Sequence, residues 1–500
     1  MLNNLTNAVP KVDTLIYQCF TASSPDHPGA MTSTSLPLRP LLAAAAALLL
    51  CACAGAVVRL PAVLSDHAVL QRAASVPVWG WADPQEAVTV EFGKQSASTR
   101  AGADGRWRVA LDLRQAASAP AVLHVRGAAN AIAVDDVLVG EVWLASGQSN
   151  MEKPLGEKSG QKPVPNHEQE IAAANYPDIR LFKVLRKKAG QPLDDVNGVW
   201  ERCAPSSIGR INFSAAAYFF GRRLHQQLRT PVGLIDATWG GTRIEPWTPS
   251  ASGTGNSSAL FNGMIAGLAP HALRGAIWYQ GESNIDHTDL SRYTGQMQAL
   301  IEGWRRYWGQ PDLPFYYAQV APHFYHIVRR QAVLDPQAAP RLWEAQADAA
   351  RIPHTGMIVT TDLVDDLYDI HPRDKQTVGL RLANVALNQT YGRHDIAAFG
   401  PAFRALTIDG KQALLSFDHA DGLAARDGKP LTWFDIAGAD GRYFAGEATV
   451  RDGKVVVTSP HVPAPVAVRF GWDEAAQPNL INGAGLPAVP FRSTREFLPQ

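Results

Sequence analysis

The sequence predicts an α/β fold in which a doubly wound parallel sheet is flanked by β-rich segments of the β-sandwich or jelly-roll type. In the middle of the chain, short apolar runs alternate with helical stretches, which is typical of a parallel sheet covered by helices on both faces. Before and after that region, short β-branched runs are separated by turns such as Asp-Gly and Asp-Pro. Such spacing is typical of antiparallel β modules.

The 500 residues of the chain are more than one hydrophobic core usually holds, so we expect several domains. The expected order is an extension with a secretory signal, an N-terminal β-rich module, an α/β domain and a C-terminal β-rich segment, at residues 1–56, 57–137, 138–400 and 401–500. A polar stretch at about 152–212 interrupts the α/β pattern, and we expect it to be an insertion.

Local patterns predict the individual elements. Alternating apolar and polar residues predict strands of the N-terminal module at 76–81, 88–92, 107–111 and 122–125. Buried-type apolar runs and helical periodicity predict, in the α/β domain, strands at 231–237, 275–279, 315–320 and 356–361, with helices at 214–228, 293–308 and 377–386. Ser214 is placed to cap the first of these helices. The C-terminal segment is expected to contain strands at 413–417, 454–458 and 467–470.

The N-terminal extension has the pattern of a secretory signal. A basic residue precedes the apolar run 41–50, and small residues suited to cleavage after Ala54 follow it. The run is shorter than the about 20 residues that span a bilayer, so no transmembrane segment is expected in the mature chain. We expect the biological start at Met31 and export to the periplasm or out of the cell. Lipid attachment at Cys53 is the alternative.

Composition excludes several classes of function. Lys+Arg and Asp+Glu both number 46, and this balance argues against a nucleic-acid footprint. Cys203 is the sole cysteine after the leader, so no intramolecular disulfide is expected, and Cys203 is expected to be a buried hydrophobe. Metal-ligand spacing and phosphate-loop or dinucleotide fingerprints do not occur in the sequence, so neither a metal nor a cofactor is expected.

Polar turns follow three of the expected strands. They lie at 147–150 (Gly-Gln-Ser-Asn), 240–242 (Gly-Gly-Thr) and 280–284 (Gln-Gly-Glu-Ser-Asn), and a fourth polar segment, 365–372, follows the strand at 356–361. Because ligands of open α/β sheets bind beyond the carboxyl ends of the strands, we expect these segments to form one site.

Two residues in these segments suggest acyl transfer. Attack of a serine on a carbonyl requires a base, a group that orients the base and donors for the oxyanion. Ser149 is the candidate nucleophile and His371 the candidate base. A serine at a strand tip or a His-Pro pair in a loop is by itself usually structural, so the hypothesis rests on their joint occurrence. The pattern Gly-x-Ser-x-Gly is absent around Ser149, which disfavours the α/β-hydrolase alternative.

Three blocks resemble the signature blocks of the sialate O-acetylesterase family, whose members are carbohydrate esterases on an SGNH-hydrolase fold. The blocks are Gly-Gln-Ser-Asn-Met at 147–151, Trp-Tyr-Gln-Gly-Glu-Ser-Asn at 278–284 and Asp-Ile-His-Pro-Arg-Asp-Lys at 369–375. The segment 479–492 is also similar to the C-terminal end of that family. The likeness extends from about residue 58 to the C-terminus.

The resemblance implies removal of acetyl groups from O-acetylated sugars, either sialic acid or plant or bacterial polysaccharide. Ser149 would form an acyl-serine, and His371 would act as general base and then as general acid. The alternative, from a different class, is a non-catalytic glycan-binding protein on a degenerate hydrolase fold.

The resemblance also implies roles for neighbouring residues. Besides the Ser149 N–H, the candidate oxyanion donors are the Gly241 N–H, with Gly240 as its rival, and the Gln280 amide. Gln148 and Asn150 are expected to hold the nucleophile loop. Arg243 is expected either to face the substrate or to form a structural ion pair.

The group that orients His371 has two candidates. The SGNH pattern places an Asp three residues before the histidine, where this chain has Tyr368. Asp369 lies two residues before His371, which in an extended segment puts both side chains on one face. Glu282, at a neighbouring strand tip, is the rival candidate.

Overall fold

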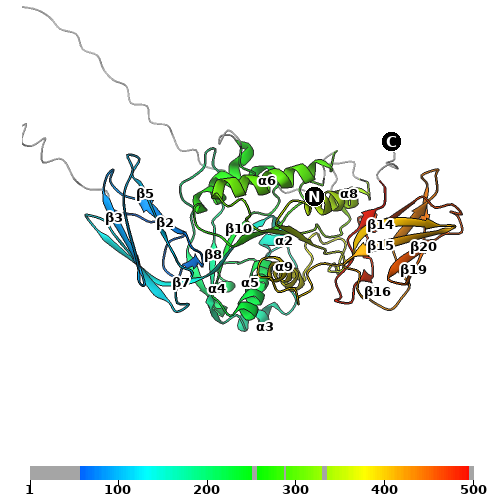
Figure 1. The fold of residues 1–500 in the computed structure, drawn as a ribbon, viewed down its shortest axis with the longest axis horizontal. Helices are drawn as coiled ribbons and strands as arrows, with labels where there is room; N and C mark the ends of the chain where they lie inside the picture. The colour runs from blue at the N-terminus through cyan, green and yellow to red at the C-terminus, as the bar shows by residue number, and fades with distance from the viewer. Residues whose placement is uncertain (1–56, 251–255, 286–288, 329–334, 495–500) are drawn as a thin grey trace, which may run out of the picture. The chain divides into compact units, whose positions relative to one another are not determined.

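The computed structural model describes residues 57–250, 256–285, 289–328 and 335–494, which belong to one compact unit (Figure 1). The expected secretory signal lies outside these residues. Among the helices of the described ranges, none combines the length and apolar character needed to cross a membrane.

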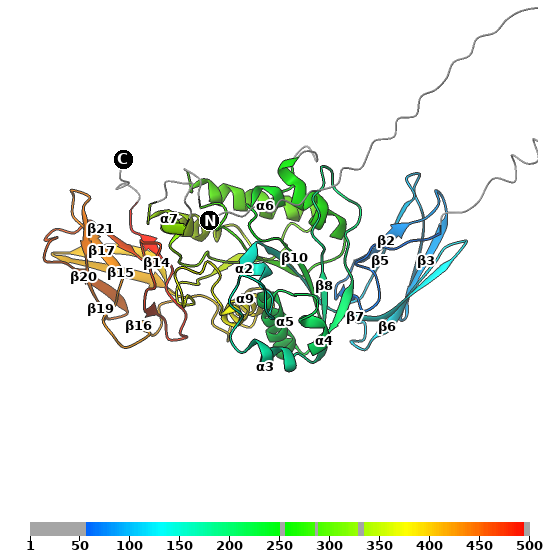
Figure 2. The ribbon, with the colours of Figure 1, turned by 180° about the vertical axis from the view of Figure 1, so that it is seen from behind.

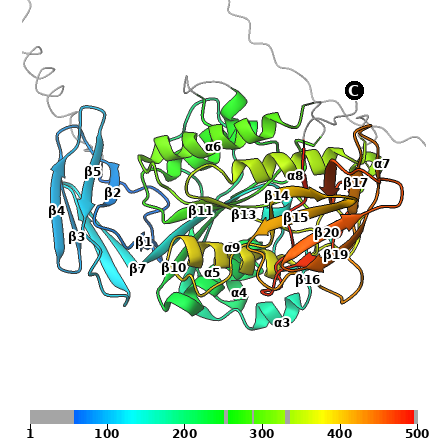
Figure 3. The ribbon, with the colours of Figure 1, turned by 45° about the vertical axis from the view of Figure 1, so that its right-hand side comes forward.

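A mostly parallel sheet forms the centre of this unit, as the alternation of strands and helices predicted (Figure 3). Its strands, in spatial order, are β13 (Thr355–Ile358), β12 (Phe315–Ala318), β11 (Gly275–Tyr279), β7 (Ala131–Gly147), β10 (Val232–Thr238), β8 (Tyr176–Lys183) and β9 (Trp200–Cys203). All adjacent pairs are parallel except β8 and β9. The chain adds strands on both sides of β7, so the strand order reverses there. The carboxyl end of β7 is therefore the point where a ligand site is expected.

Helices cover both faces of this sheet (Figures 1 and 3). The long helices are α5 (Ala215–Leu228) and α9 (Lys375–Gln389) on one face and α6 (Arg292–Trp308) and α8 (Ala338–Ala349) on the other. Short helical turns complete this part of the chain: α2 (Ser149–Glu152), α3 (His167–Ala172), α4 (Pro205–Ile208), α7 (Tyr325–Val328), η1 (Glu245–Trp247), η2 (Asn256–Ser258), η3 (Phe261–Ile265) and η4 (Ala266–Leu268). The predicted cap is confirmed, since Ser214 Oγ accepts the Ala217 N–H at 3.1 Å.

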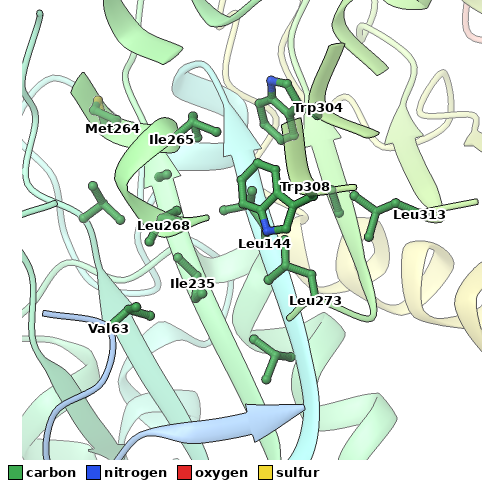
Figure 4. Packing of buried hydrophobic residues seen from close by; sticks show 14 of the residues in the cluster. Val63, Leu144, Ile235, Met264, Ile265, Leu268, Leu273, Trp304, Trp308 and Leu313 are labelled. Atoms are coloured by element: carbon green, nitrogen blue, oxygen red, sulfur yellow. The ribbon is translucent and has the colours of Figure 1, made fainter. Parts of the chain in front are cut away.

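Successive side chains of β7 point to opposite faces of the sheet and enter two separate hydrophobic clusters. Val142 and Leu144 belong to the hydrophobic cluster on the α6 side, and Trp143 and Ala145 belong to the cluster on the α5 side. Figure 4 shows Leu144 in the first cluster, close to Ile235 of the neighbouring strand. Because both faces are covered, the strand is apolar without alternation, as is typical of parallel sheets.

The N-terminal β module shares a strand with the central sheet. Its other strands are β1 (Val69–Gln71), β2 (Val76–Trp81), β3 (Ala87–Phe92), β4 (Gln95–Arg100), β5 (Arg106–Leu111) and β6 (Ala121–Arg126). The first part of β7 pairs antiparallel with β6, and the last part pairs with β10 and β11. The boundary expected at residue 137/138 therefore lies inside one continuous strand.

The polar stretch 152–212, expected from the sequence to be an insertion, adds strands to the central sheet. It contributes β8, which pairs in parallel with β10, with Ile179 opposite Val232 and Phe182 opposite Ile235. Ile179, Leu181 and Phe182 are fully buried. The sequence pattern missed this strand because its apolar run is short and lies between polar segments. Cys203, at the end of β9, is buried as expected.

The C-terminal segment forms two four-stranded sheets around its own apolar core (Figure 2). The strands are β14 (Ala402–Asp409), β15 (Gln412–Asp418), β16 (Ala424–Ala425), β17 (Phe434–Ala437), β18 (Tyr443–Ala445), β19 (Glu447–Arg451), β20 (Lys454–Thr458), β21 (Ala467–Phe470), β22 (Leu480–Ile481) and β23 (Phe491–Arg492). Arg492 joins this module to α8 through two hydrogen bonds of 2.8 Å to the Glu344 carboxylate.

The backbone conformation at the end of β7 predicts that adding one methyl group at Gly147 lowers the stability of the fold. Gly147 has φ +131°, and a Cβ there would lie 2.2 Å from the Tyr279 carbonyl oxygen. Gly147→Ala is therefore expected to lower the free energy of unfolding by about 2 kcal/mol, measured by urea unfolding. Gly156→Ala is the matched control, because its nearest contact would be an ordinary 3.6 Å to Ile171. Equal stabilities of the two variants would contradict this account.

Candidate active site

Ser149 is presented by a strand–turn–helix unit at the carboxyl end of β7. Gln148 occupies the N-cap position of α2, and Ser149 is the first helical residue. Gln148 and Asn150 are buried, whereas Ser149 is partly exposed. The serine turn, residues 147–150, therefore exposes the hydroxyl and hides its neighbours.

Gln148 joins the serine turn to the segment after β11. Its backbone N–H donates to the Tyr279 carbonyl oxygen at 3.0 Å. Its side-chain Oε1 accepts hydrogen bonds from Gln280 Nε2 and the Ser283 N–H, both at 3.1 Å. The two strand tips are thus held together by buried hydrogen bonds.

The Gln280 side chain is fully buried and bonded to neighbouring residues of the chain. Its Nε2 lies 2.7 Å from Asn284 Oδ1 and 3.1 Å from the Thr242 carbonyl oxygen, in addition to the contact with Gln148. Its Oε1 accepts from Tyr293 at 2.8 Å, and the side chain is fully buried. Because these contacts use the amide hydrogens, the geometry does not fit the expected oxyanion role.

Asn150 brings three segments of the chain together. Its Nδ2 donates to Glu282 Oε1 and, at 3.0 Å, to the Ile370 carbonyl oxygen. Its Oδ1 accepts from Lys375 Nζ at 2.8 Å. The serine turn, the tip of β11 and the loop that precedes α9 therefore meet at one amide. Lys375 was missed by sequence reasoning, although a charged residue beside an apolar helical run was a detectable signal.

Asp369 is the carboxylate next to the His371 imidazole. The imidazole Nδ1 lies 3.6 Å from Asp369 Oδ1, and the His371 backbone N–H donates to the same oxygen at 2.9 Å. Glu282 contacts the site through Asn150. Among the hydrogen bonds of the described residues, none joins Ser149 Oγ to the imidazole, and such bonds are often long before substrate binds. In these contacts Asp369 reaches His371 directly, whereas Glu282 accepts from Asn150.

The two glycines after β10 differ in the use of their N–H groups. The Gly240 N–H donates to Glu152 Oε2 at 3.2 Å, and a Cβ on Gly240 would lie 3.2 Å from Ser149 Cβ. Gly241 is exposed with φ +72°, and its N–H donates none of the backbone hydrogen bonds found in the described residues. Of the two N–H groups, that of Gly241 is therefore the one that none of the hydrogen bonds found in the described residues uses.

Burial and neighbouring cations perturb the basic groups of the site. Burial and then Lys375 lower the pKa of His371 to about 4, against the opposing effect of Asp369. Burial and then Lys153 lower the pKa of Lys375 to about 7. Burial lowers the pKa of Lys153 to about 8. His371 is therefore a neutral imidazole, able to accept a proton, over most of the pH range.

Arg243 is exposed and borders a hollow of about 800 Å³ next to Gly241. Lys188 lines the same hollow and also lies over the Trp239 ring, 5.4 Å from its centroid. Glu245 accepts a hydrogen bond from Gln296 Nε2 at 2.9 Å. Two basic side chains, Lys188 and Arg243, and the acidic Glu245 thus line the hollow next to Gly241.

Comparison with known proteins identifies the family. Residues 139–388 match the family model described as "Carbohydrate esterase, sialic acid-specific acetylesterase". A sialate O-acetylesterase from Pongo abelii is 31% identical over 501 residues, covering 88% of this chain and 93% of that protein. The chain belongs to this acetylesterase family. The human sialate O-acetylesterase is also 31% identical, over 73% of this chain and 77% of its own length.

A solved structure supports the same assignment. A carbohydrate acetylesterase from Xanthomonas citri has a TM-score of 0.81 and 38% identity, covering 88% of this chain and all of that one. This confirms the predicted fold, and together with the relatives it makes this member of the acetylesterase family a carboxylic ester hydrolase. The matched segment begins in β7 and ends in α9, so it includes both Ser149 and His371.

The lowered pKa of His371 predicts activity in acid. A base must be neutral to accept a proton, so activity is expected to persist as the pH falls and to be lost only near pH 4, compared with 6.5 for an ordinary histidine. The measurement is kcat/KM for p-nitrophenyl acetate between pH 3.5 and 8. The rate found with Ser149→Ala at each pH is subtracted as background hydrolysis. An acid half-maximum near pH 6.5 would show that the surroundings do not depress this pKa.

The positions of the two carboxylates predict unequal effects of their removal. Asp369→Asn removes the charge beside His371 Nδ1 and is expected to lower kcat by up to ~10⁴-fold, the loss found when a catalytic histidine loses its orienting carboxylate. Glu282→Gln keeps an oxygen that can accept from Asn150 and is expected to cost much less. The measurement is kcat for p-nitrophenyl acetate. A larger loss in Glu282→Gln would assign the orienting role to Glu282, and near-native rates in both would leave a Ser–His dyad.

Proposed function

We propose that this protein removes acetyl groups from O-acetylated sugars through an acyl-serine intermediate. The observation that carries the proposal is the Asn150 amide, which joins the turn of the partly exposed Ser149 to the loop of a half-buried, neutral His371 in a chain of the acetylesterase family. Nucleophile and base from distant parts of the sequence are thereby held at one end of the sheet.

In the first half of the reaction, Ser149 Oγ attacks the acetyl carbonyl carbon while His371 accepts the hydroxyl proton. The C–O bond to the sugar then breaks, and His371 returns the proton to the sugar oxygen, which leaves as a hydroxyl. In the second half, His371 takes a proton from water, the resulting hydroxide attacks the acetyl-serine, and acetate leaves as Ser149 regains its proton.

The oxyanion of each tetrahedral intermediate requires donors beside the serine. The Ser149 N–H at the start of α2 and the Gly241 N–H supply these donors in our proposal. Each such donor typically lowers the barrier by ~3 kcal/mol. Asp369 then holds the imidazole orientation and stabilises its protonated form, with the 3.6 Å contact shortening once substrate binds.

The substrate class follows from the family and from the charge beside the site. The family and its members are named for action on acetylated carbohydrate. In this chain, Lys188 and Arg243 line the hollow next to Gly241. Cations at this position favour an acetylated sugar that carries a carboxylate, such as a sialic acid, over a neutral polysaccharide.

The test compares Ser149→Ala with the unmodified protein. The unmodified protein is expected to hydrolyse p-nitrophenyl acetate and to release acetate from O-acetylated sugars, and Ser149→Ala is expected to reduce both rates by at least ~10³-fold. Ser98→Ala, on β4 in the N-terminal module, is the control and should behave as the unmodified protein. Turnover by Ser149→Ala at the native rate would refute the acyl-serine mechanism. Glycan binding without acetate release would favour the non-catalytic alternative.

A further inference from the structure

Lys375 is a fully buried lysine at the start of α9, directly below the catalytic serine turn. Its Nζ donates to Asn150 Oδ1 at 2.8 Å and lies 5.3 Å from the centroid of the Tyr279 ring. Burial of an ammonium group costs several kcal/mol unless partners compensate for the lost water. A buried lysine at this position therefore lowers the stability of the fold unless its contacts offset the cost. Its presence suggests that these contacts have a role besides stability.

The contact with Lys375 supplies the donor that the amide oxygen of Asn150 requires. An ammonium group has donors and no acceptor, so it faces the amide oxygen. The Nδ2 end donates to two acceptors, Glu282 Oε1 and the Ile370 carbonyl oxygen, so all three partners specify the same orientation of the amide. Without the lysine, the buried Oδ1 would lose the donor found for it, and the Asn150 side chain would be held at its Nδ2 end alone. Lys375 thus anchors the amide through which Asn150 joins the other two segments.

We propose that Lys375 is a positioning residue for the esterase: by holding Asn150 Oδ1, it keeps the turn of Ser149 and the loop of His371 in their reactive arrangement. This inference rests on the proposed roles of these two residues as nucleophile and base. Lys375 touches neither the substrate nor the reacting atoms in this account and acts through Asn150.

The charge of Lys375 has a second effect, on the base itself. The charged groups that act on His371 are Asp369, Lys375, Lys153 and Lys158. After burial, Lys375 is the largest cause that lowers the pKa of His371, and Asp369 opposes it. Removal of the lysine charge is therefore expected to raise the pKa of His371 and to move the acid limb of the activity profile to higher pH.

The charged groups that act on Lys375 determine how much charge it carries. Lys153 disfavours its protonated form, whereas Glu282, Asp374 and Asp369 favour it. Asp374 also caps α9 by accepting the Thr377 N–H at 2.8 Å, so its carboxylate is held close to the lysine backbone. With a pKa of about 7, Lys375 carries full charge in the acid range where His371 titrates. The electrostatic effect is therefore present where the acid limb is measured.

The experiment uses Lys375→Met, Asn150→Ala, the double variant and a control. Methionine keeps most of the length and apolar stem of the lysine, and replacing a buried charge by a hydrophobe is often tolerated by the fold. Lys162→Met is the matched control, because Lys162 is half-exposed and pairs with Asp366 in the loop before His371. Each variant is assayed for kcat and KM with p-nitrophenyl acetate, for its pH profile and for thermal unfolding.

Lys375→Met is expected to lower kcat by about 10- to 100-fold with little change in KM, since small displacements of a reacting group cost rates of this order. Its acid half-maximum should move to higher pH. The double variant should be no slower than Asn150→Ala alone, because both changes break the same contact. Lys162→Met should keep the native rate and the native acid limb.

Native kcat and acid limb in a folded Lys375→Met would overturn the inference, as would kcat losses that multiply in the double variant. If Lys375→Met does not fold, native kcat in Asn150→Ala overturns it instead, and a 10-fold or larger loss supports it. Ser149→Ala separates this result from the function itself. An active Ser149→Ala refutes the proposed function, whereas an inactive Ser149→Ala with a native Lys375→Met refutes the positioning role alone.

Discussion

The side-chain amide of Asn150 contacts the three chain segments from which the site is built. Nδ2 reaches Glu282 and the backbone before His371, and Oδ1 receives Lys375. These groups are fully or largely buried, so water cannot replace a lost partner, and each hydrogen bond is costly to break. The relative position of serine and histidine, more than 200 residues apart in sequence, depends on this small group of contacts.

The central sheet fixes the backbone positions from which the side chains of this network extend. From Val137 on, β7 is buried on both faces. It ends at Gly147, whose conformation admits no side chain, and Ser149 follows at the point where the strand order reverses. The same strand begins in the N-terminal module, so that module and the site share one continuous backbone. The C-terminal module contacts helix α8, which covers one face of the sheet, through Arg492 and Glu344.

Much of the fold and the outline of the site could be predicted from local patterns. The strand at 275–279 and the helices at 214–228 and 293–308 have clear apolar periods, and the structure places elements there. β8 escaped prediction, because a short buried strand between polar segments has no distinctive local pattern. Gln280 was assigned by analogy to an oxyanion position, yet its amide is fully used by neighbours that no local pattern connects to it.

The sequence by itself determined the fold class and the family resemblance and proposed Ser149 and His371 as nucleophile and base, because these depend on periodicity and on short contiguous motifs. Tertiary structure decided which groups touch. It placed Asp369 at the imidazole and Glu282 at Asn150, left the Gly241 N–H available while Glu152 takes that of Gly240, and buried Lys375 under the serine turn. The physical reason is that hydrogen-bond partners and burial are set by residues distant in sequence, and their geometry exists only when the chain has folded.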